Sequence, residues 1–483
     1  MLFNSFDFAL FLPTVFLLHW FVFKQSRSSQ NGFIAAASYV FYAWWDWRFL
    51  SLILFSTVLD YSIGIALQRS QRVLLRKALL MASLTGNLGL LFTFKYHGFF
   101  VESLGLALSS IGFETSLWSL NVILPVGISF YTFQTLSYSI DVYRRKIPAC
   151  SDPLAYIAYV SFFPQLVAGP IERAAHLLPQ FERKREFSYT DAVDGMRQIL
   201  WGLFKKMVIA DNCAIVVDQV FEDYNELNAS ALLLGIFLFS FQIYGDFSGY
   251  SDIAIGTARL LGVRLQRNFA YPYFSRDIAE FWRRWHISLS SWFRDYVYIP
   301  LGGSRCARWK CIRNVMLTFL ISGFWHGANW TFIAWGAFHG LLFLPLLLRE
   351  ENRKHMDTPA ANRFLPTFRE TAAIMLTFSL VMLGWVFFRS PTLGDAFAFL
   401  GGMLEPSLLE LPNLYYKLYA LKSLLLIIVF VAIEWFGRHH AYAIEGLSRV
   451  QNPFLRYFAY FCLTVSVLWF AALERNAFIY FQF

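Results

Sequence analysis

The sequence predicts an all-α polytopic membrane protein with about eleven or twelve transmembrane helices. Of its 483 residues, 57% are hydrophobic and only 15% are charged. A soluble domain carries about 25% charged residues, so this chain has too few charges to cover its apolar surface in water. Its mean hydropathy of +0.46 indicates the same class. Lipid is therefore the expected solvent for most of its surface.

Apolar runs of roughly membrane-spanning length follow one another along the chain. The first, residues 6–23, is followed by Lys24 and Arg27. A cleavable signal peptide has its basic residues before the apolar run and a small-residue cleavage site after it, so we predict a retained first span. The other runs lie at residues 33–46, 49–68, 78–94, 121–140, 191–217, 230–262, 314–327, 329–348, 370–388, 418–437 and 453–473.

Basic residues gather in the segments between these runs. Cytoplasmic segments of membrane proteins are enriched in Lys and Arg, and assigning every basic cluster to the cytoplasm pairs the spans almost without conflict. Both termini are then predicted to face outside. The net charge of +9 is therefore explained by basic cytoplasmic segments and is not taken as a sign of nucleic-acid binding. The clusters are Lys24/Arg27, Arg69/Arg72/Arg76/Lys77, Arg144/Arg145/Lys146, Arg183/Lys184/Arg185, Arg264/Arg267, Arg305/Arg308/Lys310/Arg313, Arg349/Arg353/Lys354 and Arg438.

Two stretches do not fit a simple span. Residues 154–187 interrupt an apolar run with three prolines and a glycine, and residues 277–303 have helical periodicity but too many charges to face lipid. Broken or charged backbone at membrane depth is tolerated where it is buried in protein or lines a wet cavity, so both stretches are predicted to be re-entrant or interfacial. The chain shows no internal repeat, low-complexity tract or soluble domain boundary, and residues 1–483 are predicted to form one membrane domain.

The second of these stretches carries three polar residues at helical spacing. Arg283, His286 and Ser290 are separated by three and four residues, which would place them on one face of a continuous helix. Such a face suits a cavity wall that meets an anionic or hydroxylic ligand. An amphipathic helix among lipid headgroups is the equally weighted alternative.

Two histidines lie in the apolar sequence SGFWHGANWTFIAWGAFHG, residues 322–340. Gly323 and Gly327 flank His326 and would allow close approach of another helix or a ligand, and Asn329 could orient its ring if the helix is unbroken. An ionisable residue within a span is a functional candidate, although a helix histidine is more often structural. His339 follows 13 residues later, about 140° around a single straight helix, so the two histidines are not expected to address one substrate.

A third polar run lies in the span at residues 240–256. Its two carboxylates allow two interpretations, a proton or ion pathway and a structural hydrogen-bonded cluster. The polar residues are Asp246, Ser248, Ser251 and Asp252.

Several kinds of chemistry have no support in the sequence. The chain contains no GxSxG elbow, P-loop or HExxH motif, which excludes the common serine hydrolase, nucleotidase and zinc protease signatures. Its five cysteines are scattered, and Cys306 and Cys311 do not have the spacing of a CxxC pair. Neither a zinc site nor a disulfide framework is predicted.

Six motifs occur in order along nearly the whole chain: LPVGISFYTFQTLSYSIDVYR (124–144), FFPQLVAGPIER (162–173), IYGDFSGYSDIAIG (243–256), EFWRRWHISLSSWFRDYVYIPLGG (280–303), GFWHGANWTFIAWGAFHG (323–340) and FIYFQF (478–483). Together they resemble the membrane-bound O-acyltransferases, in the branch of the alginate O-acetylation protein and the D-alanyl transferase of teichoic acids. The motif around His286 is nearly the form found in the alginate-type branch.

The resemblance implies a central funnel with a thin floor, where an acyl donor from the cytoplasm meets an acceptor from the other side. It implies that His326 is the catalytic base and that His286 is a second catalytic histidine, which positions a reactant or stabilises the oxyanion. His339 receives no role. The residues assigned to substrate binding are Asn329, Arg283, Ser290 and Trp325, with Arg283, Arg284 and Arg294 as candidates for the donor's phosphates.

The expected function is transfer of an acetyl group in a bacterial inner membrane. Acetyl-CoA is the expected donor substrate, with no permanently bound cofactor and no metal. The acceptor is expected to be an exported polysaccharide or a periplasmic partner acetyltransferase. A transporter of acyl groups or lipid-linked sugars is the main alternative; Asp246 and Asp252 support it, but the internal repeats typical of transporters are missing. A scaffold for exopolysaccharide enzymes would leave His286 and His326 unexplained.

Overall fold

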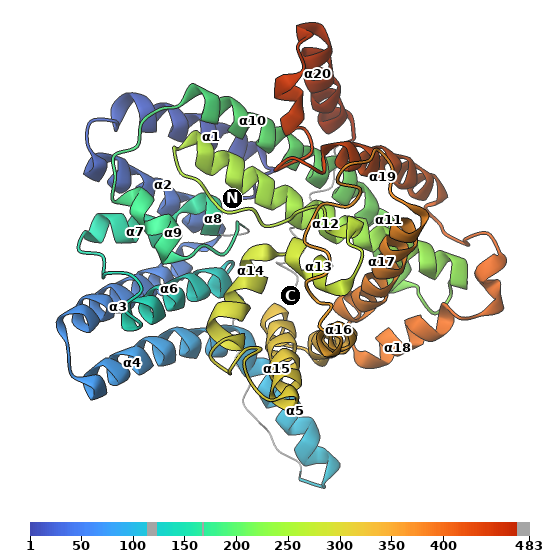
Figure 1. Cartoon of the computed structure of the whole chain (residues 1–483), viewed down its shortest axis with the longest axis horizontal. Helices are drawn as coiled ribbons and strands as arrows, with labels where there is room; N and C mark the ends of the chain where they lie inside the picture. The colour runs from blue at the N-terminus through green and yellow to red at the C-terminus, as the bar shows by residue number, and fades with distance from the viewer. Residues whose placement is uncertain (114–122, 167–168, 471–483) are drawn as a thin grey trace. The chain divides into compact units, whose positions relative to one another are not determined.

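The computed structural model describes residues 1–113, 123–166 and 169–470, and all regular structure within these ranges is helical (Figure 1). This confirms the predicted all-α class. The helices are α1 (Phe6–Leu17), α2 (Arg27–Asp46), α3 (Leu50–Arg69), α4 (Val73–Leu91), α5 (His97–Ser110), α6 (Ile128–Tyr143), α7 (Pro153–Ser161), α8 (Phe163–Leu166), α9 (Ala174–Phe181), α10 (Tyr189–Leu203), α11 (Asp211–Glu222), α12 (Ala229–Leu260), α13 (Ile278–Arg284), α14 (Ile287–Phe293), α15 (Arg308–His326), α16 (Trp330–Leu348), α17 (Phe368–Arg389), α18 (Leu393–Gly402), α19 (Lys417–Gly437) and α20 (Pro453–Phe470). Short π or 3-10 turns are η1 (Leu18–Val22), η2 (Trp47–Phe49), η3 (Phe92–Tyr96), η4 (Phe204–Ala210), η5 (Pro272–Phe274), η6 (Arg294–Tyr298), η7 (Pro406–Leu409) and η8 (Glu445–Arg449).

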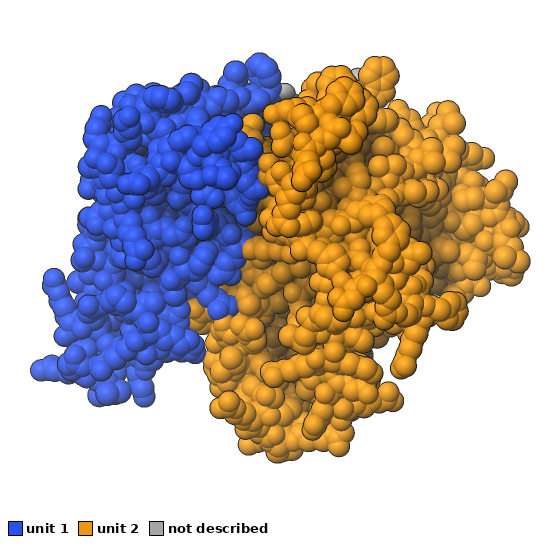
Figure 2. All heavy atoms as spheres, turned by 45° about the horizontal axis from the view of Figure 1, so that its top comes forward, with its two compact units in different colours: residues 1–195, 257–266 blue, residues 196–256, 267–483 orange. Residues whose placement is uncertain are grey.

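The chain folds into two compact units, coloured separately in Figure 2. Unit 1 contains Met1–Gly195 and Thr257–Gln266, and unit 2 contains Met196–Gly256 and Arg267–Phe483. Each unit is assembled from segments that are separated in the sequence. The chain therefore passes between the two units more than once, and no single position divides it into two consecutive domains.

Seven helical stretches in the described part of the chain are long and apolar enough to cross a membrane. Two of them each contain two consecutive helices: Arg27–Arg69 holds α2 and α3, and Val73–Ser110 holds α4 and α5. The first apolar run, Phe6–Val22, forms the shorter helical stretch α1 and η1. These stretches confirm a polytopic membrane protein.

The two stretches predicted to be re-entrant or interfacial are both broken into short helices. Residues 154–187 form α7, α8 and α9, and residues 277–303 form α13, α14 and η6. Pro153 starts α7, a position where its fixed φ suits a helix. Pro179 lies within α9, where its missing N–H limits helix length. The FIYFQF motif and residues 167–168 of the FFPQLVAGPIER motif lie outside the described residues, as do the start of the run at 121–140 and the end of the run at 453–473.

Unit 1 is held together by a buried carboxylate. Asp60 on α3 accepts hydrogen bonds from Ser139 Oγ on α6 at 2.7 Å and from Asn87 Nδ2 on α4 at 2.7 Å, and Ser83 on α4 donates a third. A buried carboxylate without such donors would be very costly. The three helices are therefore fixed around one polar centre.

Unit 2 contains a close helix crossing that fixes the end of α15. A Cβ atom at Gly323 on α15 would overlap the backbone of Phe332, and one at Gly336 on α16 would overlap the backbone of Phe319. Glycine at these positions lets two helix backbones touch. The predicted close approach around His326 is confirmed, and it comes from the neighbouring helix α16.

The carboxylates of the span at 240–256 are paired with lysines of η4. Lys206 Nζ lies 2.8 Å from Asp246 and 2.8 Å from Asp211, and Lys205 Nζ lies 2.5 Å from Asp252. All five side chains belong to unit 2. The pairing favours a structural cluster over a proton or ion pathway, and the transporter alternative loses its sequence support.

Replacing the shared lysine should destabilise unit 2 strongly. Lys206→Met leaves the buried carboxylates of Asp211 and Asp246 without their common cation, and removing one partner of a buried ion pair costs about 3–5 kcal/mol. We expect a clear fall in Tm of the purified protein in detergent. Lys417→Met, at an exposed lysine that starts α19, is the matched control and should leave Tm unchanged. A wild-type Tm for Lys206→Met would contradict the structural role.

Candidate active site

His326 lies at the last residue of α15, where the helix ends abruptly. Gly327 has extended backbone angles, φ −159° and ψ 149°, and Asn329 begins the next helix by accepting a hydrogen bond from Thr331 N at 3.0 Å. The Asn329 amide also donates to the carbonyl of Pro391 at 2.8 Å. Asn329 is therefore a helix cap, and the expectation that it shares a helix face with His326 is wrong.

His339 lies on α16 and packs among aromatic rings. Its ring centroid is 5.0 Å from that of Trp335 and 5.1 Å from that of Trp282, and the side chain is fully buried. A Cβ at Gly384 would come within 2.8 Å of its Nε2, which leaves no room for a substrate on that side. The argument from a single straight helix is wrong, because the chain breaks between His326 and His339.

His286 lies between α13 and α14 in an unusual backbone conformation. Its φ of 43° and ψ of 54° fall in the left-handed region, which costs a residue other than glycine about 1–3 kcal/mol. Two backbone hydrogen bonds hold the bend, Ala270 N to Arg284 O and Ile287 N to Asn268 O, both at 2.9 Å. The buried His286 therefore lies at a fixed bend between two short helices.

The protonation of His286 is determined by Asn268. The Asn268 Oδ1 atom accepts from Ser288 N at 3.3 Å and from Ser288 Oγ at 2.9 Å, and it lies 3.1 Å from His286 Nδ1. A backbone N–H can only donate, so the amide atom that faces it is the oxygen, and His286 Nδ1 must carry the proton. Nε2 then has a free lone pair and, among the described residues, no hydrogen-bond partner. Burial lowers the pKa of His286 to about 3, so the ring is neutral at physiological pH.

The two histidines of the signature motifs lie close together in unit 2. The ring centroids of His286 and His326 are 6.3 Å apart. Trp325 lies beside them, with its ring centroid 6.2 Å from that of His286, and Trp335 packs edge-on against His326 at 5.0 Å. Both imidazoles are buried in an aromatic environment.

Arg283 and Ser290 do not share a helix face with His286, because the helix ends at Arg284 and a new one starts at Ile287. Arg283 donates to the backbone carbonyls of Asn352 and His355, both at 2.7 Å. Ser290 lines a separate cavity described below. The prediction of one polar face across α13 and α14 is therefore wrong.

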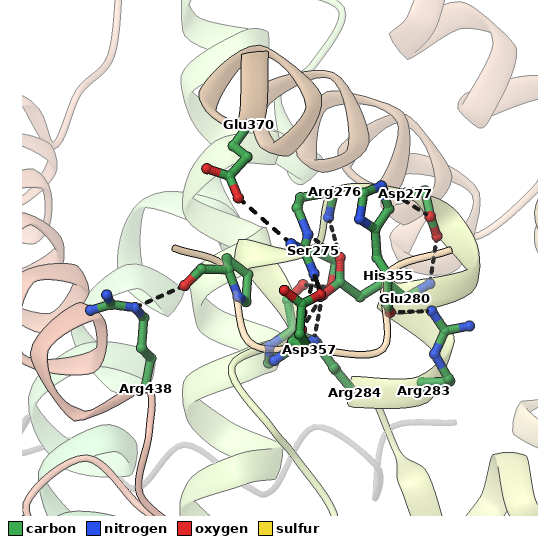
Figure 3. A network of polar contacts seen from close by, with 12 residues as sticks. Ser275, Arg276, Asp277, Glu280, Arg283, Arg284, His355, Asp357, Glu370 and Arg438 are labelled. Atoms are coloured by element: carbon green, nitrogen blue, oxygen red, sulfur yellow. Dashed lines mark hydrogen bonds and ion pairs between the residues drawn. The ribbon is translucent and has the colours of Figure 1, made fainter. Parts of the chain in front are cut away.

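A network of arginines fixes the loop between α16 and α17 to α13 (Figure 3). Arg276 and Glu280 form a buried pair at 3.0 Å, and Arg276 and Arg284 each donate 2.9 Å hydrogen bonds to the backbone carbonyl of Asp357. Arg438, the residue that follows α19, donates to the carbonyls of Pro359, Ala360 and Arg363 in the same loop. Arg283 and Arg284 are thus occupied with the loop backbone, which argues against their predicted contact with phosphates.

Unit 2 contains a cavity of about 800 Å³ bounded by α14, α15, α16 and the start of the loop that follows α16. Three exposed arginines line it, Arg294, Arg308 and Arg353, together with buried apolar side chains such as Val315 and Phe293. Of the three arginines predicted to meet phosphates, Arg294 is the one that lines this cavity. The cavity lining combines arginines with apolar side chains, which suits an elongated ligand with an anionic end and an apolar end.

Two cysteines on the cavity wall are closer than their spacing suggested. The Sγ atoms of Cys306 and Cys311 lie 3.2 Å apart, and both residues line the cavity. The loop before α15 folds back onto its first turn and brings the thiols together. The sequence offered no signal for this contact, because a separation of five residues matches no common thiol motif.

Sequence reasoning also missed Asn268, Arg308 and Arg353 as individual candidates. Asn268 precedes His286 by 18 residues and lies in a loop, so no helical or strand period links the two. Arg308 and Arg353 were recognised only as members of basic clusters. In the structure they line the same cavity, because α15 and the loop after α16 both border it.

Comparison with known proteins agrees with the resemblance. A model of the membrane-bound O-acyltransferase family matches residues 139–387, which include both His286 and His326. The chain is 37% identical to the probable alginate O-acetylase AlgI of Pseudomonas putida over 98% of each chain. It is 38% identical to that of Pseudomonas aeruginosa over 90% of this chain and 80% of the relative. It is 37% identical to the peptidoglycan O-acetyltransferase of Helicobacter pylori over 84% of this chain and 80% of the relative.

Proposed function

The chain belongs to the membrane-bound O-acyltransferase family, and we propose that it transfers an acetyl group from acetyl-CoA to a hydroxyl of an exported polysaccharide or of a periplasmic partner acetyltransferase. The observation that carries this proposal is the buried pair of His286 and His326, with ring centroids 6.3 Å apart. Two named relatives act on alginate and on peptidoglycan, which supports a polysaccharide acceptor. Membership of the family supports a bacterial inner membrane location, and the basic clusters support a topology with both termini in the periplasm.

In the proposed reaction, His326 takes the proton of the acceptor hydroxyl while the hydroxyl oxygen attacks the thioester carbonyl. The tetrahedral adduct then releases the CoA thiolate, which recovers the proton from the imidazolium and leaves as a thiol. His326 suits this role because it lies in the last turn of α15. The negative end of a helix dipole stabilises a nearby cation by about 0.3–2 kcal/mol, and the cation here would be the imidazolium formed during attack.

His286 is better suited to positioning than to stabilising the oxyanion. An oxyanion needs hydrogen-bond donors, but the only proton of the neutral ring points to Asn268. Nε2 can only accept a hydrogen bond. We therefore assign it to the acceptor substrate, where it would accept from a second hydroxyl next to the reacting one and so hold the reacting hydroxyl in line for His326.

The donor is proposed to enter through the 800 Å³ cavity. Arg308 and Arg353 belong to two basic clusters that are predicted to be cytoplasmic, and both line this cavity with Arg294. Guanidinium groups are well matched to phosphates, so the nucleotide end of CoA would lie at these arginines. The apolar part of the lining would accommodate the pantetheine arm.

Neutralising two of these arginines should weaken donor binding without slowing the chemistry. For R308Q/R353Q we expect KM for acetyl-CoA to rise about tenfold with kcat nearly unchanged, because the lost contacts are made equally in the ground and transition states. S-acetylpantetheine, which lacks the nucleotide, should be used equally well by variant and wild type.

R305Q/R349Q is the matched control, since it removes one charge from each of the same clusters at positions that do not line the cavity. Equal KM values for acetyl-CoA in the two double variants would refute the proposed donor entry.

The class of reaction is tested directly with purified full-length protein in sealed vesicles and labelled acetyl-CoA. Transfer of label to an acceptor polysaccharide supports the enzyme. Appearance of intact acetyl-CoA inside the vesicles without transfer would support a carrier instead. The acceptor is identified by measuring alkali-released acetate from each envelope polymer in cells with and without the protein.

A further inference from the structure

Unit 1 contains a cavity of about 480 Å³ that the acyl-transfer proposal does not use. It is formed by the end of the apolar stretch Phe6–Val22, the residues just after it, and the loop between α9 and α10, whose positions can be followed in Figure 1. The cavity therefore lies where a predicted membrane span ends. The basic clusters on both of its sides are predicted to be cytoplasmic.

The cavity has an excess of positive charge. Lys24, Lys184 and Arg185 line it, against the single carboxylate of Glu186. Both lysines are exposed and can move toward a ligand, whereas Arg185 is only 6% exposed. Such a site attracts an anion and disfavours a cation or a neutral group.

Arg185 is held in place before any ligand arrives. Its backbone N–H donates to Gln30 Oε1 and its carbonyl accepts from Gln30 Nε2, both at 2.9 Å. Its Nη2 donates to Asn31 Oδ1 at 3.0 Å. These contacts attach the loop to α2 and fix the guanidinium at the cavity wall.

One donor of this guanidinium is left over. The Nε of Arg185 is buried and has no hydrogen-bond partner among the described residues, and no carboxylate in those ranges forms an ion pair with the side chain. Burial lowers the pKa of Arg185 to about 10, so it is still charged at neutral pH. A buried N–H without an acceptor is unfavourable, and a phosphate oxygen would satisfy it.

Aromatic rings form the other side of the cavity. The ring of Phe187 lies 6.0 Å from that of Phe16 and 5.5 Å from that of Trp20. Phe21, also in the lining, is 70% exposed, and Phe187 is 50% exposed. Exposed aromatic residues beside cations at the end of a span are typical of a membrane interface.

We propose that this cavity binds the headgroup of an anionic phospholipid from the cytoplasmic leaflet. The phosphate would accept from Arg185 Nε and pair with Lys24 and Lys184, and the start of the acyl chains would lie along Phe16, Phe21 and Phe187. Basic pockets beside membrane spans on the cytoplasmic side bind anionic headgroups in this way. The proposal concerns unit 1 alone and is independent of the histidine chemistry of unit 2.

The test uses purified full-length protein and native mass spectrometry after incubation with an equal mixture of phosphatidylglycerol and phosphatidylcholine in detergent. Wild type should retain phosphatidylglycerol preferentially. K24Q/K184Q should retain about 30-fold less of it, since each lysine near an anionic headgroup contributes on the order of 1 kcal/mol. R72Q/K77Q removes two exposed charges from another basic cluster of the same unit and should retain the wild-type amount.

Further measurements distinguish a lipid site from a site for free anions, and separate this proposal from the acyl-transfer proposal. Inorganic phosphate at millimolar concentration should not displace the lipid, because it lacks the apolar contacts; displacement would overturn the lipid site in favour of a free anion site. Equal retention of the two lipids by wild type would overturn it as well. Acetyl transfer by K24Q/K184Q in detergent should equal that of wild type, so a failure of either proposal leaves the other intact.

Discussion

His326→Ala is expected to lower the rate of acetyl transfer by about 10²–10⁴-fold, which is the contribution of a positioned general base. The loss should be in kcat, since the imidazole acts on the proton that moves in the transition state. The measurement is transfer of labelled acetyl groups from acetyl-CoA by purified protein. His326 is buried and packed against Trp335 and Phe388, so the variant must also be compared with wild type in Tm.

His326→Asn separates chemistry from packing, because an amide fills part of the imidazole volume but does not take a proton at neutral pH. We expect it to be as inactive as His326→Ala while its Tm is closer to that of wild type. His439→Ala, at an exposed histidine, is the matched control and should be fully active. Substantial acetyl transfer by His326→Asn would exclude His326 as the base.

Asn268→Leu should lower kcat by about 10–100-fold with a smaller change in KM for acetyl-CoA, which is the size of effect expected when a supporting group is removed. Without Asn268 Oδ1, the proton of His286 is no longer held on Nδ1. The ring can then adopt the other tautomer, in which Nε2 carries a proton and no longer accepts from the hydroxyl next to the reacting one. Asn268 would thus be a positioning residue that acts through His286.

Asn268→Asp should change the pH dependence of activity, which a purely structural role of Asn268 would not do. A carboxylate keeps the hydrogen bond to Nδ1 but places a negative charge beside the ring, which raises the pKa of His286 from its low value. As pH falls through the raised pKa, Nε2 is protonated and stops accepting. Between about pH 8 and pH 6, near where histidine titrates, this variant should lose a larger fraction of its activity than wild type.

Asn452→Asp provides the control for the added charge. Asn452 is exposed and caps α20 by accepting from Phe454 N at 2.9 Å, a hydrogen bond that aspartate also makes. Its pH profile should follow that of wild type. If Asn268→Asp also follows wild type, His286 does not act through an unprotonated Nε2.

The sequence was sufficient to predict the helical class and to select the two histidines as candidates, for different reasons. Hydropathy runs identify spans because lipid forces every backbone group in a span to be paired internally. His286 and His326 were selected by motif resemblance, and the fold brings their rings within 6.3 Å. No periodicity argument predicted that distance, because the two residues lie on separate elements 40 positions apart.

The errors of the sequence analysis all concern places where the helix stops. The apolar runs at 314–327 and 329–348 nearly touch, and helical periodicity continues across His286, so neither pattern shows how sharply the helix ends at these two places. The first break depends on the cap made by Asn329, and the second on backbone hydrogen bonds from the loop around residues 268–270. Because of these breaks, the side chains on their two sides do not share a helix face. Arg283 and Asn329 then bind carbonyls of other segments.

The loop between α16 and α17 is held by arginines that bind its main-chain carbonyls. Every residue has a carbonyl oxygen, so these contacts depend on the course of the loop backbone and not on the side chains that the loop carries. Substitutions between residues 350 and 363 should therefore be tolerated as long as the backbone can follow the same course, except at Arg353, which lines the cavity, and at Asp357, whose carboxylate also pairs with Arg276. The anchoring arginines lie elsewhere, in and just before α13 and just after α19. The remaining loop positions can vary in sequence while this side of the 800 Å³ cavity keeps its shape.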